Sequence, residues 1–180
     1  MGDALAPESV KLIAGLLAAE DEHFALARTE LEARFGAIDL ESDIWPFGST
    51  HYYEGEIGPT ILRRFVSFDE LIPPDRLAPL KLATNELELQ LRERLGTPPG
   101  QRPINIDPGY VTLGSLVLAT TKNRAHRIYL RDGIYAEVTL TYERGGWAAA
   151  PWTYPDYAAP TYHAFLTAVR ERLKQVRRRG

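Results

Sequence analysis

One segment of the chain holds most of the side chains that could do chemistry. Residues 105–130, NIDPGYVTLGSLVLATTKNRAHRIYL, set acidic, amide, basic and hydroxyl groups among strongly apolar neighbours. The polar residues are Asn105, Asp107, Tyr110, Thr120, Thr121, Lys122, Asn123, His126 and Arg127. Groups of these types can transfer protons, bind an anion or ligate a divalent metal ion, so we expect the segment to form one side of a pocket.

A histidine and a glutamate are predicted to meet in this part of the chain. The Asp132-Gly133 pair is a strong signal for a two-residue hairpin turn. If the two strands of the hairpin pair regularly from this turn, Tyr129 lies opposite Ala136. His126 and Glu137 are then diagonal neighbours on the opposite face of the hairpin from Tyr129. A carboxylate beside an imidazole fixes the ring, as a general base or a metal-binding histidine requires. The alternative is a half-exposed histidine paired with a surface acid.

Asn105 and Asp107 share the polar face of a short expected strand. Asp107 precedes Pro108-Gly109, which predicts a turn that would present the carboxylate at the strand end. Tyr110 follows and could line the same site. The alternative is that Asp107 only caps the turn.

Two adjacent arginines, Arg63 and Arg64, interrupt an otherwise apolar strand. A buried charge is costly unless it is paired or binds an anion. We expect at least one of them to face solvent or to pair with Glu54 or Glu56, and the other to be a candidate clamp for phosphate or carboxylate.

The segment PWTYPDY, residues 151–157, combines two prolines with three aromatic residues. The simpler interpretation is an extended strap that covers the open face of the core, because aromatic side chains bury large areas. The alternative is a stacking wall for a base or a sugar, with Trp152 against the ligand and Asp156 at its end.

Strand and helix patterns alternate along the first 107 residues. The expected order is strand 10–17, helix 24–35, strand 38–45, strand 61–68, a helix after Pro73-Pro74 through Leu95, and strand 103–107. This order, βαββαβ, is that of a ferredoxin-like α+β fold. In that fold the first and third strands are central, and these are the two strands with apolar residues on both faces. The second and fourth strands would be edges.

Residues 108–180 are expected to extend this core. Between Ser115 and Tyr142 the pattern predicts a three-stranded meander, and Pro160 opens a final helix. We expect one domain over 1–180, with 1–8 flexible, 9–107 as the βαββαβ core and 108–180 as meander, aromatic strap and final helix.

Composition limits the classes of partner. The net charge of -3 over 180 residues gives no general attraction to nucleic acid or to an acidic membrane. The chain has no cysteine, which excludes thiolate chemistry and suits a reducing cytoplasm. The longest apolar run, residues 12–19, is too short to span a bilayer, so we expect a soluble, cytoplasmic protein without a membrane partner.

Leu82 and Leu89 lie off the main apolar stripe of their helix and could form a homodimer contact.

The segments FGAIDLESDIWPF, HYYEGEIGP, RRFVSF, KLATNELE, NIDPGYVTLGSLVLATTKNRAHRIYLRDGIYAEVTLTY and PWTYPDY resemble a prokaryotic family known as domain of unknown function 4416. The resemblance runs from about Lys11 to Leu173. Members are often labelled GTP-binding protein, but the chain has no GxxxxGK[ST] phosphate loop. The resemblance implies no catalytic assignment.

These observations favour an enzyme or a binding domain for a phosphorylated or nucleotide-like small molecule. Asp107, His126 and Glu137 would supply acid–base chemistry, and Asp107 with Glu137 could hold Mg²⁺ or Mn²⁺. Ligand contacts would come from Arg63, Arg64, Asn105, Tyr110, Lys122, Arg127 and Trp152. The alternatives are a non-catalytic RNA-binding or protein-interaction module, which would expose aromatic residues within a basic patch.

Overall fold

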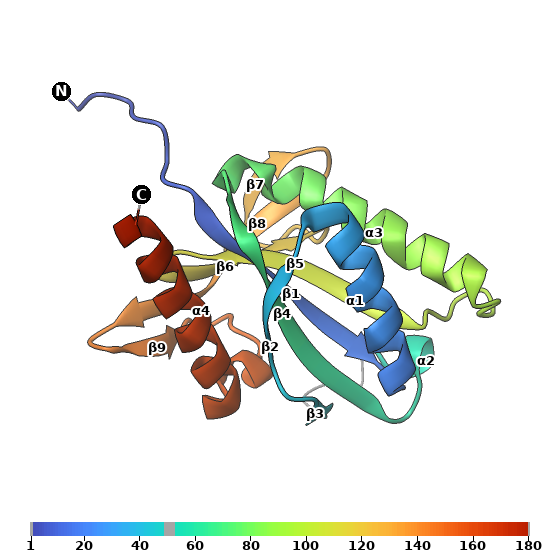
Figure 1. The fold of residues 1–180 in the computed structure, drawn as a ribbon. Coiled ribbons are helices and arrows are strands. Elements are labelled where there is room, and N and C mark those ends of the chain that lie inside the picture. Colours follow the sequence, from blue (N-terminus) through green and yellow to red (C-terminus); the bar gives the residue numbers. More distant parts are fainter. Residues whose placement is uncertain (1, 49–52, 180) are drawn as a thin grey trace.

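The computed structural model describes residues 2–48 and 53–179, and within them nine strands form one antiparallel sheet (Figure 1). The strands are β1 (Val10–Ala18), β2 (Ile38–Glu41), β3 (Trp45–Phe47), β4 (Ile61–Ile72), β5 (Ile104–Val111), β6 (Ser115–Thr120), β7 (Ile128–Arg131), β8 (Ile134–Glu143) and β9 (Gly146–Ala149). The helices are α1 (Asp21–Phe35), α2 (Glu54–Ile57), α3 (Leu77–Arg94) and α4 (Pro160–Arg179), with short 3₁₀ helices η1 (Pro74–Arg76) and η2 (Pro155–Ala158). The protein is therefore α+β, as its sequence predicts.

The sheet has helices on both faces because its central strands are apolar on both faces. The strand order is β2-β4-β1-β5-β6-β8-β7, with β3 beside β4 and β9 beside β8. All nine residues of β1 are buried. Leu12 and Leu16 belong to the core cluster that includes α1 and α3, whereas Ile13 belongs to the cluster that includes α4. Strands β1 and β4 are thus interior, as predicted.

The expected edge strand at 38–45 is divided into β2 and β3, which both pair with β4. The division falls at Ser42, whose backbone N–H donates to the carbonyl oxygen of Phe65 and whose Oγ accepts the Phe65 N–H. The side chain thus takes the acceptor position that a backbone carbonyl would occupy, and the chain leaves the ladder before it returns at Trp45.

The fourth strand is longer than predicted and is not an edge. Strand β5 runs through Pro108-Gly109, so the predicted turn at that dipeptide is wrong. Pro108 pairs with Ala14 of β1, and Gly109 pairs with Leu118 of β6. A Cβ atom on Gly109 would lie 2.5 Å from the carbonyl oxygen of Val117, so glycine here permits the close approach of β6.

The predicted meander is also wrong in its order. Strand β8 lies between β6 and β7 and also pairs with β9. The turn at Asp132-Gly133 is confirmed, because both residues have positive φ. A register shift between Tyr129 and Arg131 pairs Tyr129 with Tyr135, however, and not with Ala136.

The remaining predicted features concern helices. In α4 the predicted core residues Tyr162, Phe165, Leu166, Val169 and Leu173 are buried, whereas Val176 is exposed. Leu82 and Leu89 of α3 are exposed. Within the described ranges no helix is both long enough and apolar enough to pass through a membrane.

Candidate functional site

A gap between β5 and β6 creates the site. The two strands pair only from Gly109 to Val111, and β6 continues beyond this point beside β8 alone. Pro108 has no backbone N–H and cannot complete the next pair, which explains why the ladder ends there.

Side chains of α3 replace the missing strand. The backbone N–H of Ile106 donates to Oε1 of Glu88 at 2.6 Å, and Nζ of Lys81 donates to the carbonyl oxygen of Ile106 at 3.0 Å. Both backbone groups of Ile106 are therefore satisfied without β6, as buried polar groups must be. The gap can stay open as part of the native fold.

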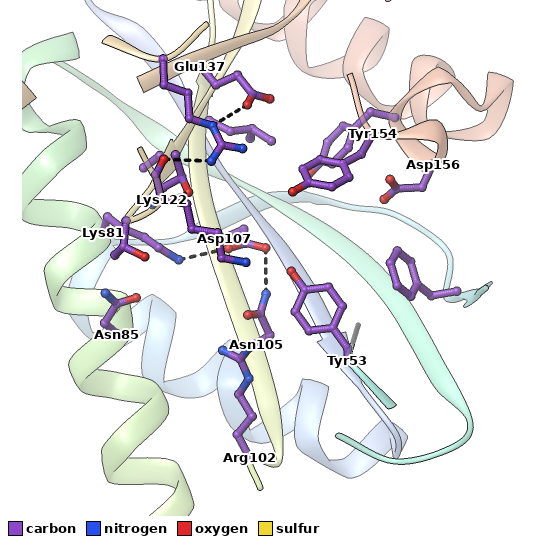
Figure 2. A pocket seen from close by; sticks show the side chains of 17 residues that line it. Tyr53, Lys81, Asn85, Arg102, Asn105, Asp107, Lys122, Glu137, Tyr154 and Asp156 are labelled. Carbon is purple, nitrogen blue, oxygen red and sulfur yellow. Dashed lines mark hydrogen bonds and ion pairs between the residues drawn. The ribbon is translucent and has the colours of Figure 1, made fainter. Parts of the chain in front are cut away.

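A cavity of about 270 Å³ lies at this gap (Figure 2). Its polar and charged lining comes from separate segments: Lys81, Asn85, Arg102, Asn105, Asp107, Thr120, Thr121, Lys122, Arg127, Glu137 and Asp156. Its aromatic lining consists of Phe47, Tyr53, Tyr154 and Tyr157. The cavity thus joins α3, β5, the segment after β6, β8 and the strap at 151–157, which are far apart in sequence.

Asp107 lies on the β5 wall and is held by two hydrogen bonds. Its Oδ1 accepts from Nζ of Lys81 at 3.0 Å, and its Oδ2 accepts from Nδ2 of Asn105 at 2.8 Å. Burial alone would raise the pKa of Asp107, but the charges of Lys81 and Arg63 and the two hydrogen bonds lower it below its ordinary value. Asp107 is therefore ionised at neutral pH.

Glu137, on β8, anchors a second ionic cluster. Its Oε2 accepts from Nε of Arg127 at 2.8 Å and lies 2.9 Å from Nε2 of His126. The predicted contact between His126 and Glu137 is present, although His126 lies in the loop before β7. The ring of His126 stacks on that of Trp152, with centroids 5.1 Å apart. The cluster joins the loop before β7 to the aromatic strap.

Asp156 lies at the opposite wall, in η2, and pairs with Arg63. The Nη2 atom of Arg63 is 3.0 Å from Oδ2 of Asp156. The guanidinium of Arg63 also lies 5.0 to 6.0 Å from the ring centroids of four aromatic residues, Phe47, Phe65, Tyr157 and Tyr162. Burial raises the pKa of Asp156, in spite of the charge of Arg63.

Glycine on β1 makes room for this arginine. A Cβ atom on Gly15 would lie 3.0 Å from Nη1 of Arg63 and 3.3 Å from the hydroxyl of Tyr157. Arg63 is 3% exposed. Its Nε and Nη1 atoms have no hydrogen-bond partner in the described part of the chain.

The structure brings five of the predicted site residues to the cavity: Asn105, Asp107, Lys122, Arg127 and Glu137. Arg63 and His126 contact the lining residues Asp156 and Glu137, and Trp152 stacks on His126. Two lie elsewhere. Arg64 pairs with Glu41 at 3.0 Å, and Tyr110 packs against core residues.

Sequence reasoning missed the contribution of α3 and of the loop before β5. Lys81, Thr84 and Glu88 fall on the buried stripe of α3, at helical spacing. The sequence signal for a contribution of α3 to the site was the repetition of polar residues on its apolar stripe, because buried polar groups need partners. Arg102 pairs with Glu88 at 3.0 Å and with Glu56 at 2.5 Å, and no local pattern marks it.

The carboxylates of the cavity are paired with cations. Within the ranges that the structure describes, no three or more histidine and acidic side chains converge as metal ligands. Asp107 and Glu137, which the sequence offered as possible ligands of Mg²⁺ or Mn²⁺, each contact a basic side chain. The donor set is therefore better suited to recognising an anion.

Fold and cavity together define an α+β protein with a charged, aromatic-walled pocket at a break in its sheet. The family model described as "Domain of unknown function (DUF4416)" matches residues 8–173. The chain belongs to this family. Neither the search of curated proteins nor that of solved structures gives a match.

Proposed function

We propose that the cavity binds a small phosphorylated or nucleotide-like molecule. The observation that carries the proposal is that four cationic side chains from three segments, α3, the loop before β5 and the loop between β6 and β7, line one cavity, against three acidic ones. The cations are Lys81, Arg102, Lys122 and Arg127. A phosphate group is the ligand that converging lysine and arginine side chains recognise best.

The cations keep donors for a ligand although they contact acids. Lys81 uses two of its three N–H donors within the described residues, on Asp107 and on Ile106. Arg127 uses Nε on Glu137 and Nη1 on the carbonyl oxygen of Lys122. These bonds hold the cations in place before a ligand arrives, which reduces the entropy cost of binding.

Aromatic and amide groups support a nucleotide-like ligand. Tyr53 and Tyr154 project into the cavity from the side opposite Lys81 (Figure 2). Their rings could stack on a base or a sugar, while the amides of Asn85 and Asn105 could read its polar edge. A volume of about 270 Å³ is near the lower limit for ligand pockets, which favours one nucleotide or sugar phosphate.

The distribution of acids favours a pocket over an RNA-binding platform. An RNA platform would need exposed aromatic residues within a basic patch. Here the acids cluster at the cavity, where Glu137 is buried and Asp107 is partly buried.

The ferredoxin-like core and the cytoplasmic location of the protein are also proposals. The order β2-β4-β1-β5, with α1 and α3 packed on one face, supports the ferredoxin-like interpretation of the first 107 residues. The absence of cysteine supports a reducing, cytoplasmic compartment.

A thermal-shift screen tests the binding proposal. The panel contains nucleoside 5′-monophosphates, ribose 5-phosphate, inorganic phosphate, MgCl₂ and a short single-stranded RNA. A ligand at a hundredfold excess over its Kd stabilises the native state by about 2.7 kcal/mol. For a chain of this length the melting temperature should rise by about 5 to 10 °C.

Matched variants locate the binding. Lys122→Met removes a lining cation and should weaken phosphate-dependent binding about tenfold or more. Arg124→Met removes an exposed cation that does not line the cavity and should leave binding unchanged. A screen in which only RNA shifts the melting temperature, or in which both variants bind alike, would contradict the proposal.

A further inference from the structure

We propose that this cavity hydrolyses a glycosidic bond in its phosphorylated ligand, with Asp156 as the proton donor to the leaving group and Asp107 as the acceptor of the proton from water. The inference rests on the proposed function, since the reaction needs the ligand in the cavity. Glycosidic hydrolysis is a reaction that a pair of carboxylic acids in two different environments performs.

The two carboxylates face one cavity from different elements. Asp107 extends from β5, and Asp156 extends from η2 beyond the rings of Tyr53 and Tyr154 (Figure 2). A sugar ring between the two tyrosines would have a carboxylate on each side, as glycosidic hydrolysis requires.

The surroundings of the two carboxylates differ as their roles require. Asp107 accepts hydrogen bonds from Lys81 and Asn105, and these contacts stabilise its ionised form. Asp156 has a side chain that is only 9% exposed and pairs with Arg63, whose guanidinium is surrounded by aromatic rings, and burial raises the pKa of Asp156 in spite of this charge. A proton donor must hold its proton near neutral pH, and a proton acceptor must be ionised there.

The burial of Arg63 beside Asp156 is a second, independent observation. Arg63 is 3% exposed and lies 3.0 Å from Asp156, and its Nε and Nη1 donors have no partner among the described residues. Buried donors without partners are rare and mark sites of function or of a further ligand. When Asp156 gives up its proton, the resulting carboxylate has this guanidinium beside it. Arg63 is thus a positioning residue that stabilises the charge developed on Asp156.

The reaction balances without an oxidant or a reductant. The bond between the anomeric carbon and the leaving nitrogen or oxygen breaks, and its electron pair leaves with that atom, which takes the proton of Asp156. The oxygen of water bonds to the anomeric carbon and gives a proton to Asp107. Asp107 releases this proton to solvent, and Asp156 regains one from solvent. The products are the free sugar phosphate and the protonated leaving group.

The test measures binding and cleavage on the same protein. Nucleoside 5′-monophosphates report cleavage of an N-glycosidic bond through release of the free base, separated by chromatography. Nitrophenyl glycoside 6-phosphates report cleavage of an O-glycosidic bond through release of nitrophenol. Calorimetry gives Kd for each compound, and the two arms distinguish which glycoside is the substrate.

Three variants separate chemistry from binding. Asp156→Asn and Asp107→Asn should each slow release by about 100-fold or more, with Kd within about threefold of the wild-type value. Asp132→Asn, in the exposed turn between β7 and β8, should leave release unchanged. The pH profile of the wild-type protein is a readout that does not depend on the folding of any variant. Release should slow as the pH rises through the pKa of Asp156.

The outcomes are distinct. Loss of release in Asp156→Asn, together with a wild-type rate that declines as the pH rises through the pKa of Asp156, supports the proposal. Binding of the panel without release, or release that survives in Asp156→Asn, overturns the hydrolytic role and leaves the binding function intact. Absence of binding overturns the proposed function and with it this inference.

Discussion

The Nζ atom of Lys81 lies 3.0 Å from Oδ1 of Asp107, although α3 and the Asp107 side chain lie on different sides of the sheet. Ile104 and Ile106 of β5 belong to the core cluster of α1 and α3, so alternation directs Asp107 toward the other face. The lysine reaches the carboxylate because β6 has separated from β5 after Gly109. One ion pair therefore links the helical layer, the break in the sheet and the cavity.

Loss of this ion pair should destabilise the fold. Lys81→Met leaves Asp107 without its nearest cation and the carbonyl oxygen of Ile106 without its donor. Breaking a buried ion pair costs about 3 to 5 kcal/mol, and the 27% exposure of the Asp107 side chain should reduce the loss to about 2 to 3 kcal/mol. Urea denaturation provides the measurement. Lys174→Met, which removes a surface pair with Glu171, should change stability by less than about 1 kcal/mol, and equal losses would refute this account.

The contribution of Asp107 to stability should depend on pH. Its pKa in the folded protein is lower than the ordinary value of 3.8, so the folded state binds a proton less readily than the unfolded state. The stabilisation is then fully present above about pH 4 to 5 and is lost as the pH falls through the folded pKa. The free energy of unfolding of the wild-type protein minus that of Asp107→Asn should therefore decrease between pH 6 and pH 2. A difference that stays constant or increases would show that the pKa is not lowered.

Glycine at position 109 should be needed for the contact between β5 and β6. In Gly109→Ala the new Cβ atom would meet the carbonyl oxygen of Val117 at 2.5 Å and a methyl group of Leu118 at 2.6 Å. Separating the strands should cost about 1 to 3 kcal/mol, as overpacking typically does. The control is Gly114→Ala in the same hairpin, where nothing lies within 4 Å of the added atom. Calorimetric melting should show a clear decrease for the first variant and almost none for the second.

Regular patterns in the sequence identified the layers of the fold. The apolar residues on both faces of β1 and β4 predicted interior strands, and the spacing in α1, α3 and α4 predicted helices that cover the sheet. Pro108 was misleading because proline followed by glycine usually marks a turn. Here the proline removes one N–H from the β6 side of β5, and its effect becomes clear only when the position of β6 is known.

The site was only partly predictable for a similar reason. Part of the segment 105–130 faces the cavity as expected, since Asn105, Asp107, Lys122 and Arg127 line it, whereas Tyr110 and His126 do not. Lys81 and Arg102 reach the cavity through tertiary packing, and no spacing rule connects them to β5. The order of β7 and β8 depends on which strand pairs with β6, and turn chemistry does not determine that choice.

The aromatic wall should distinguish nucleotides from simpler phosphates. Tyr154 is 48% exposed and lines the cavity, so Tyr154→Ala should affect binding more than folding. Loss of stacking on a base should weaken nucleotide binding by about 1 to 3 kcal/mol. Ribose 5-phosphate, which has no base, should bind both proteins almost equally. Calorimetric titration of both ligands would disprove the stacking role if the two affinities declined by the same factor.

The most direct test of the central claim is a two-dimensional ¹H–¹⁵N NMR titration of the labelled protein with the nucleoside monophosphates and sugar phosphates of the screen. We predict saturable shifts of the side-chain amides of Asn85 and Asn105 and of the backbone amides of residues 119–122, which surround the cavity. Lys122→Met should weaken the apparent affinity without changing which signals move. Saturable shifts confined to the exposed strand β7, or none with any member of the panel, would contradict the claim that this cavity is the binding site.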